Sequence, residues 1–252
     1  MALSLRHLIT ALGLLLGTTA FAQKTPAPEP PPATFQLFSI LPVADMFYDL
    51  GGKPVSASTG QNAYSQPYLV PSTGELSFYR LVPSPEPGKP PVRVPVVAAS
   101  VNAQKGAENL IVLYPDGPLV QYDEGAPPQP LKSIVLDNTR TAHPARMMRV
   151  FSFSRRPVAI KIGTQTVMLT AMQPTMIPYP EGSRTWINVA TTGEQSWQRV
   201  IGTPQMLAEN TRLSLFLNDI PPSRNDPNPV GLSMKKIIES IAPPADPVLA
   251  RR

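Results

Sequence analysis

One arrangement of short apolar segments occurs twice in this chain, and this repetition constrains the fold more than any other feature. Residues 35–49 open the first copy and residues 148–163 open the second, each with a Phe-Ser pair at residues 38–39 and 151–152. Each copy is roughly a hundred residues long, whereas solenoid repeats run about 20–50 residues. The sequence therefore predicts two tandem domains of the same kind.

Proline limits what these domains can be. The chain holds 33 prolines among 252 residues, and proline is confined to turns, edges and bulges of sheets and stops helices. Residues 44–50 alternate apolar and polar side chains, and residues 110–114 form an apolar run that ends in a Pro-Asp-Gly-Pro turn. Short strands with frequent turns over a hundred residues are typical of a sandwich. We predict an all-β protein, with two tandem immunoglobulin-like β-sandwich domains.

The N-terminal segment has the parts of a secretory signal peptide. Residues 1–22 combine Arg6, an apolar stretch at residues 8–16 and the small-x-small cleavage site at residues 20–22. The apolar stretch is too short to cross a bilayer. We therefore expect export, to the periplasm or the medium, with no membrane span in the mature chain.

The rest of the chain divides by composition. A stiff proline-rich spacer comes first, then the two repeats and a polar tail, at residues 23–32, 33–140, 141–242 and 243–252. The pattern in residues 230–241 fits either a short helix or a final strand. Asp137–Arg146 reads as a short polar link, for which we expect a modest polar interface and separate unfolding of the two units.

Catalytic and metal-binding patterns are weak throughout. The chain has no cysteine, which excludes disulfides, thiolate metal sites and a cysteine nucleophile. His143 is the one histidine after the leader and reads as a solvated residue of the link. Asp45 and Asp49 would share one face of a strand about 13 Å apart, beyond the ~5–9.5 Å of a glycosidase pair. We expect no enzyme activity, no metal and no cofactor.

Three aromatic residues of the second repeat are candidates for contact with a ligand. Trp186 stands in the strand that matches Phe78, so we expect it in the core. Trp197 follows a polar turn and is freer, and together with Tyr179 it forms the tentative ligand-contact pair.

The first repeat also resembles a known family. Asp45-Met-Phe-Tyr-Asp49, Ser65-Gln-Pro-Tyr68 and the later strand Leu110–Tyr114 are similar to motifs of the bacterial exported family called domain of unknown function 4397. The resemblance implies tandem β-sandwich repeats and an exported location. It brings no established chemistry with it.

These observations favour binding over catalysis. We expect an exported, non-catalytic binding or scaffolding protein of the bacterial cell envelope, whose partner is an envelope protein or a polysaccharide. One alternative is a carbohydrate-binding module that uses Trp197 and Tyr179, and a second is a hydrolase with an unrecognised site. Residues 141–252 hold an excess of basic side chains, which fits a solvated surface or contact with acidic polymers or anionic membranes. No basic run with interleaved aromatics suggests nucleic acid.

Overall fold

The chain folds into β-strands with no helix among the residues that the structure describes. The structure is a computed structural model, and the residues described are 29–43, 46–60, 62–120, 128–182, 184–193 and 196–241. The predicted signal peptide, most of the spacer and nearly all of the tail lie outside these ranges. Residues 31–241 belong to one compact unit.

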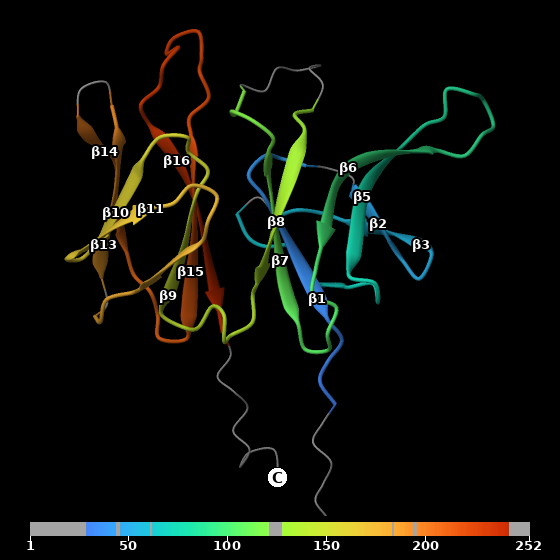
Figure 1. The fold of residues 1–252 in the computed structure, drawn as a ribbon, viewed down its shortest axis with the longest axis horizontal. Coiled ribbons are helices and arrows are strands. Elements are labelled where there is room, and N and C mark those ends of the chain that lie inside the picture. Colours follow the sequence, from blue (N-terminus) through green and yellow to red (C-terminus); the bar gives the residue numbers. More distant parts are fainter. Residues whose placement is uncertain are drawn as a thin grey trace, which may run out of the picture. The chain divides into compact units, whose positions relative to one another are not determined.

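Eight strands form each half of this unit (Figure 1). The first half contains β1 (Thr34–Ser39), β2 (Met46–Leu50), β3 (Lys53–Ala57), β4 (Tyr68–Leu69), β5 (Glu75–Val82), β6 (Val92–Ser100), β7 (Glu108–Pro115) and β8 (Leu131–Asp137). The second half contains β9 (Met147–Ser152), β10 (Val158–Ile162), β11 (Gln165–Leu169), β12 (Thr175–Pro178), β13 (Thr185–Thr192), β14 (Trp197–Gln205), β15 (Thr211–Asp219) and β16 (Leu232–Ser240). The segment that fitted either a helix or a strand is the strand β16.

The predicted repetition of strand order is confirmed. The first half has sheets β4-β1-β7-β8 and β3-β2-β5-β6, and the second has β12-β9-β15-β16 and β11-β10-β13-β14, which is the same order displaced by eight strands. In both halves the first strand runs parallel to the seventh and antiparallel to the fourth. An immunoglobulin strand order is not confirmed, because each half has two four-stranded sheets where the constant-type domain has four strands and three.

Even an irregularity of the pairing recurs in both halves. The register shifts between Phe78 and Tyr79 in the β5–β6 ladder and between Val189 and Ala190 in the β13–β14 ladder. Such a bulge places an extra residue on one strand and increases the local twist. The bulge aligns the two halves residue by residue, so that Val189 corresponds to Phe78.

Each half closes around an apolar core of its own. In the first half Phe35, Leu37 and Ile111 of one sheet pack against Tyr48 and Phe78 of the other. In the second half the equivalent cluster is aliphatic apart from Tyr179 and joins residues of β9, β12 and β15 to residues of β10, β11 and β13. Two sheets facing each other across such a core form a sandwich.

A third apolar cluster joins the two halves, and it corrects the expectation of a polar interface. Phe38 and Val112 of the first half belong to the same buried cluster as Phe151 and Phe216 of the second. The rings of Phe38 and Phe216 stack with their centroids 4.2 Å apart. Sheets β4-β1-β7-β8 and β12-β9-β15-β16 thus bury both of their faces, and Figure 1 shows them between the two outer sheets.

Polar contacts also connect the halves. Tyr64 Oη donates a hydrogen bond of 2.7 Å to Ser214 Oγ. Lys235 Nζ donates to the carbonyl oxygens of Ile40, at 2.7 Å, and Ser39, at 3.2 Å. The first half is therefore attached to β15 and β16 by side chains as well as by the link.

The link is only partly solvated, because Asn138 and His143 are buried while Asp137, Arg140 and Pro144 are exposed. His143 is fully buried, and its Nε2 lies 3.2 Å from the carbonyl oxygen of Met147. Arg212, on β15, donates to the carbonyl oxygens of Asn138 and His143 and forms a two-pronged ion pair with Glu239. Buried arginines thus hold the carbonyl groups of Asn138 and His143, while other polar residues of the link, such as Arg140, are exposed to water.

Candidate functional site

The outer face of the sheet β11-β10-β13-β14 is the most distinctive surface of the second half. Along β13 the side chains of Ile187 and Val189 point into the core, while those of Trp186, Asn188 and Ala190 point outward. This alternation follows from the period of two along a strand. The outward residues of β10, β11 and β14 complete the face.

A hollow of about 780 Å³ lies on this face, which we call the open face. Its lining includes one aromatic ring, two cations and two neutral polar side chains around small residues. They are Trp186, Lys161, Arg199, Asn188, Thr166 and the glycine Gly202. No Asp or Glu is among the described lining residues.

The pairing of the strands sets the order of these side chains. Thr166, Lys161, Asn188 and Gly202 are paired in sequence across β11, β10, β13 and β14, and so form one row perpendicular to the strands. Neighbouring strands lie about 4.8 Å apart, so the row is roughly 14 Å long. A Cβ atom at Gly202 would be 3.4 Å from Asn188 Oδ1 and 3.9 Å from Arg199 Nε. The absence of a side chain at Gly202 therefore leaves room for these two groups to converge.

The equivalent face of the first half is filled by its own side chains. Phe47 stacks on Tyr79 with ring centroids 6.2 Å apart, and the guanidinium of Arg93 lies 4.5 Å from the Tyr79 centroid. Tyr79 Oη donates to Asp49 Oδ1 at 2.8 Å, and Arg93 Nη1 donates to Asp49 Oδ2 at 2.6 Å. The hydrogen bonds from Tyr79 and Arg93 lower the pKa of Asp49.

Every member of this cluster is different in the second half. The ladder registers give the equivalent pairs Phe47 and Ala159, Asp49 and Lys161, Tyr79 and Ala190, and Arg93 and Trp197. Two aromatic rings are replaced by methyl groups, which opens the hollow. The acid of the ion pair becomes a lysine and its arginine becomes a tryptophan, so no internal partner is left for the charge.

Two tryptophans mark the ends of the open face. Trp186 is paired with Pro204 and is 54% exposed, and Trp197 is paired with Thr192 and is 46% exposed. Since Trp186 and Thr192 are six residues apart on β13, the two ends are about 20 Å apart along the strand. Trp186 lines the hollow, and Trp197 lies beyond its other end, which Ala190 and Arg199 form.

Trp186 was expected in the core, and this prediction is wrong. The bulge aligns Phe78 with Val189, so Trp186 corresponds to the exposed Glu75 rather than to a core residue. A shift of one residue moves a side chain to the opposite face of a strand. The sequence held the signal for this, because Ile187 and Val189 flank the polar Asn188.

Tyr179 does not join Trp197. It is 5% exposed, its hydroxyl donates a hydrogen bond to the carbonyl oxygen of Gln205, and the Arg146 guanidinium lies 5.7 Å from its ring centroid. Burial raises the pKa of Tyr179. Gln205 ends β14, whereas Trp197 begins it. The structure therefore places the two predicted contact residues at opposite ends of that strand.

A second hollow, of about 800 Å³, lies where the loops after β7, β9 and β15 meet. Arg156 donates to Asp219 Oδ1 at 2.8 Å and to the carbonyl oxygen of Val230. Lys132 forms an ion pair of 2.7 Å with Asp116. Most of the charged groups around this hollow are thus paired internally, unlike those of the open face.

His143 was expected to be solvated, and this prediction is wrong, because the ring is fully buried. Burial, followed by the charges of Arg149 and Arg212, lowers its pKa to about 3. A fully buried ring in the link has no access to a substrate. Within the described ranges no group of three or more His, Asp or Glu side chains is placed to hold a metal ion.

Among the described residues there is no helix with the length and apolarity needed to cross a membrane. Compared with models of protein families and with curated proteins, the chain matches none. The resemblance to the exported family called domain of unknown function 4397 therefore stays a prediction.

Proposed function

We propose that the chain is an exported, non-catalytic protein of the bacterial cell envelope that binds a carbohydrate chain along the open face. Two exposed tryptophans about 20 Å apart on one face of the sheet support this proposal. The apolar faces of sugar rings stack on indole rings, which are large and rigid and carry a polar N–H. Asn188 and Thr166 between them offer hydrogen bonds to hydroxyl groups.

The comparison between the halves argues against an ordinary exposed surface. Phe47 and Tyr79 show how side chains of the first half fill the equivalent face. The second half has lost that filling and gained an exposed Trp197 instead. Large exposed apolar groups rimmed by polar ones mark interaction sites more often than chance.

The proposal is tested by affinity electrophoresis against a panel of neutral and acidic polysaccharides. We expect retardation by at least one of them, and loss of that retardation in Trp186→Ala and in Trp197→Ala. Met206→Ala is the matched control, because Met206 is exposed in the same half but does not line the hollow. If both tryptophan variants are still retarded by the polysaccharide, the open face is not the binding site.

A second test fills the hollow instead of removing its rings. The double variant Ala159→Phe and Ala190→Tyr restores the aromatic pair of the first half at the equivalent positions. We expect this variant to fold as stably as the parent and to lose binding. Unchanged binding would contradict a ligand lying in the hollow.

Export is a separate part of the proposal. It rests on the predicted signal peptide, which lies outside the described residues. Sequencing the N-terminus of protein recovered from the periplasm or medium of a bacterial host is expected to give Gln23. A start at Met1 would contradict export through this leader.

A further inference from the structure

We propose that the carbohydrate taken by the open face is an acidic polysaccharide, whose carboxylate or sulfate groups bind Lys161 and Arg199. This inference rests on the proposed function and adds the substrate class to it. Both proposals place the ligand on the face that carries Trp186 and Trp197.

The charges around the hollow have one sign. Lys161 and Arg199 line it, both are exposed, and no hydrogen bond or ion pair joins either side chain to any other group in the described part of the chain. Arg93, Lys132 and Arg156, by contrast, are paired with carboxylates. The cations of the open face are left available to a ligand.

The first half shows that this charge is not required by the fold. At the position of Lys161 the first half has Asp49, and its negative charge is neutralised by Arg93. The second half reverses the sign at Lys161 and replaces the arginine by Trp197. A cation beside an aromatic ring suits a sugar that carries an acid group, because the ring stacks on the sugar and the cation binds the acid.

The register places the cations between the two indole rings. Lys161, on β10, is paired with Asn188 of β13. Asn188 is two residues along β13 from Trp186. Arg199 is paired with Ala190, one row further towards Trp197. An extended chain that stacks on both rings therefore passes both cations, and its acid groups meet them in turn.

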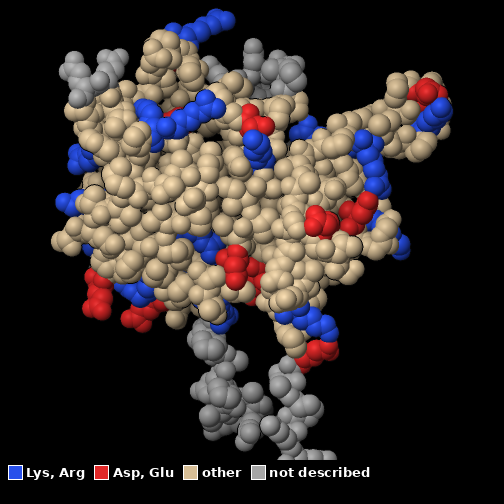
Figure 2. Space-filling model, viewed as in Figure 1, with Lys and Arg blue, Asp and Glu red and all other residues tan. Residues whose placement is uncertain are grey.

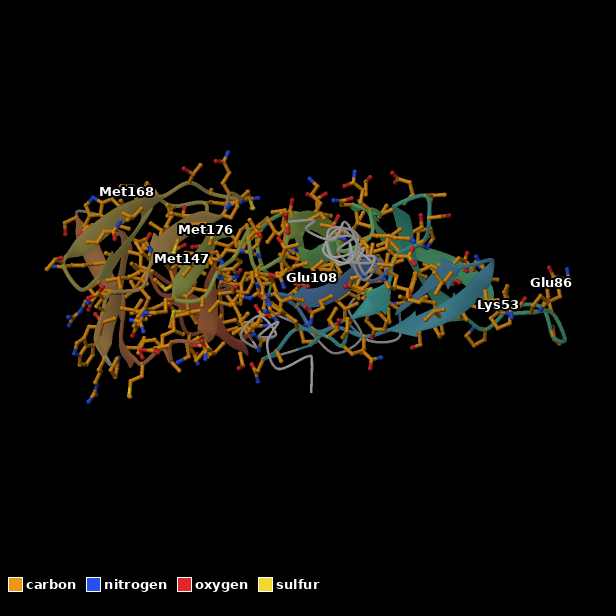
Figure 3. The ribbon with its side chains drawn as sticks, turned by 90° about the horizontal axis from the view of Figure 1, so that it is seen from below. Lys53, Glu86, Glu108, Met147, Met168 and Met176 are labelled. Atoms are coloured by element: carbon orange, nitrogen blue, oxygen red, sulfur yellow. The ribbon has the colours of Figure 1, made fainter. Side chains whose placement is uncertain are left out.

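The test uses polygalacturonate and the same polymer with its carboxyl groups reduced to hydroxymethyl groups. We expect the protein to bind the acidic form about tenfold or more tightly than the reduced form, with an affinity that falls as salt is added. Lys161→Gln combined with Arg199→Gln is expected to remove this preference. The control is Lys53→Gln combined with Arg140→Gln, which changes the net charge equally at exposed positions. Lys53 is far from the open face. Figure 3 shows it at the opposite end of the view from Met168, which is paired with Ala159 of the open face.

The outcomes separate the two proposals. Equal binding of both forms, lost in Trp186→Ala, would overturn the acidic class and keep carbohydrate binding. Failure to bind any polysaccharide of the panel would overturn the proposed function itself. A single-stranded oligonucleotide also carries acid groups, and its bases also stack on indole rings. If it binds through Lys161 and Arg199 more tightly than polygalacturonate does, the assignment of a polysaccharide ligand is overturned. Loss of preference in the Lys53 and Arg140 control would show a general charge effect and would overturn the assignment to Lys161 and Arg199.

Discussion

Arg212 is the residue on which the link between the halves depends most. Its guanidinium is buried, it holds Glu239 through two hydrogen bonds, at 2.9 Å and 3.1 Å, and it donates to two carbonyl oxygens of the link. Planar, bidentate pairing of this kind is specific to arginine. Arg212 thus attaches the link to β15, together with the backbone hydrogen bond from Arg146 N to the carbonyl oxygen of Thr211.

Replacing Arg212 by leucine is expected to lower the free energy of unfolding by about 3–5 kcal/mol, because a partly buried carboxylate and two carbonyl groups lose their donor. Urea unfolding followed by tryptophan fluorescence measures this. The control is Arg140→Leu, an exposed residue of the same link, for which we expect a change within about 0.5 kcal/mol. A small effect at Arg212 would show that water replaces its hydrogen bonds.

His143 predicts a pH dependence of stability. Its folded-state pKa of about 3 is below the ordinary value of 6.5, because the ring is buried and faces Arg149 and Arg212. The unfolded chain therefore binds a proton first as the pH falls, and stability is lost between about pH 6.5 and pH 3. Above pH 6.5 the histidine is neutral in both states and contributes no pH dependence.

The measurement is the difference in unfolding free energy between wild type and His143→Gln across this pH range. Carboxylates titrate in both proteins, so only the difference reports on His143. We expect the wild type to lose stability more steeply than the variant between pH 6.5 and pH 3. Parallel pH profiles would contradict a neutral buried ring.

At the scale of single elements, the central strands differ from the outer ones. β7 and β15 are buried on both faces, whereas β5 and β13 alternate between buried and exposed residues. The sequence shows this difference as continuous apolar runs in residues 110–114 and 213–217. Such runs are typical of strands covered on both sides. Polar Ser214 interrupts the second run, and there Tyr64 supplies its hydrogen bond.

This difference separates two charge substitutions. Phe78→Asp buries a carboxylate in the core of the first half, and Phe151→Asp buries one in the cluster shared by both halves. Both are expected to cost several kcal/mol, because the charge is buried without a partner. Amide hydrogen exchange is the measurement. We expect Phe78→Asp to increase exchange mainly in the first half, in strands β1 to β7. Phe151→Asp is expected to increase exchange in both halves together, in β1, β7, β9 and β15. Protection in β7 that survives Phe151→Asp would contradict a shared core.

The β5–β6 hairpin is another element with a character of its own. It extends beyond the sheet in Figure 1, and Figure 2 shows basic and acidic side chains together near its tip, where Lys89 and Glu86 form an ion pair. Leu81, Val92 and Val94 are exposed along it. An exposed ion pair of this kind contributes little to stability, so the tip is held mainly by its backbone pairing and its prolines.

At the scale of the whole molecule, the shared apolar cluster changes how the chain is expected to unfold. The halves at residues 33–140 and 141–242 each have a core, but separation would expose Phe38, Val112, Phe151 and Phe216 to water. Burial of such side chains contributes about 1.5–3 kcal/mol each. That the halves are separate domains stays a prediction, and the shared cluster couples them.

We therefore predict one cooperative transition in calorimetry of the whole chain, in place of the two steps that a polar interface would give. Each half expressed alone is expected to melt at a lower temperature than the whole chain or to associate through its exposed sheet. Two transitions at the melting temperatures of the isolated halves would contradict this coupling.

The sequence by itself determined the features that depend on local periodicity. Alternation of side chains, prolines and turns such as Pro115-Asp-Gly-Pro118, whose Gly117 has a positive φ, located strands. The recurring order of these strands revealed the two halves. Trp197 was also recognised as an exposed candidate, because it follows a polar turn rather than an apolar run.

Only the tertiary structure decided which faces meet. The correspondence of Trp186 with Glu75 rather than with Phe78 follows from the ladder registers, which no residue pattern within β13 specifies. The burial of His143 depends on Arg149 and Arg212, which come later in the chain and reach back to the link. The open face exists because the small residues Ala159 and Ala190 are paired and Gly202, on a third strand, lies in the neighbouring row. Pairing and packing between distant segments set these features, and no local pattern of residues records them.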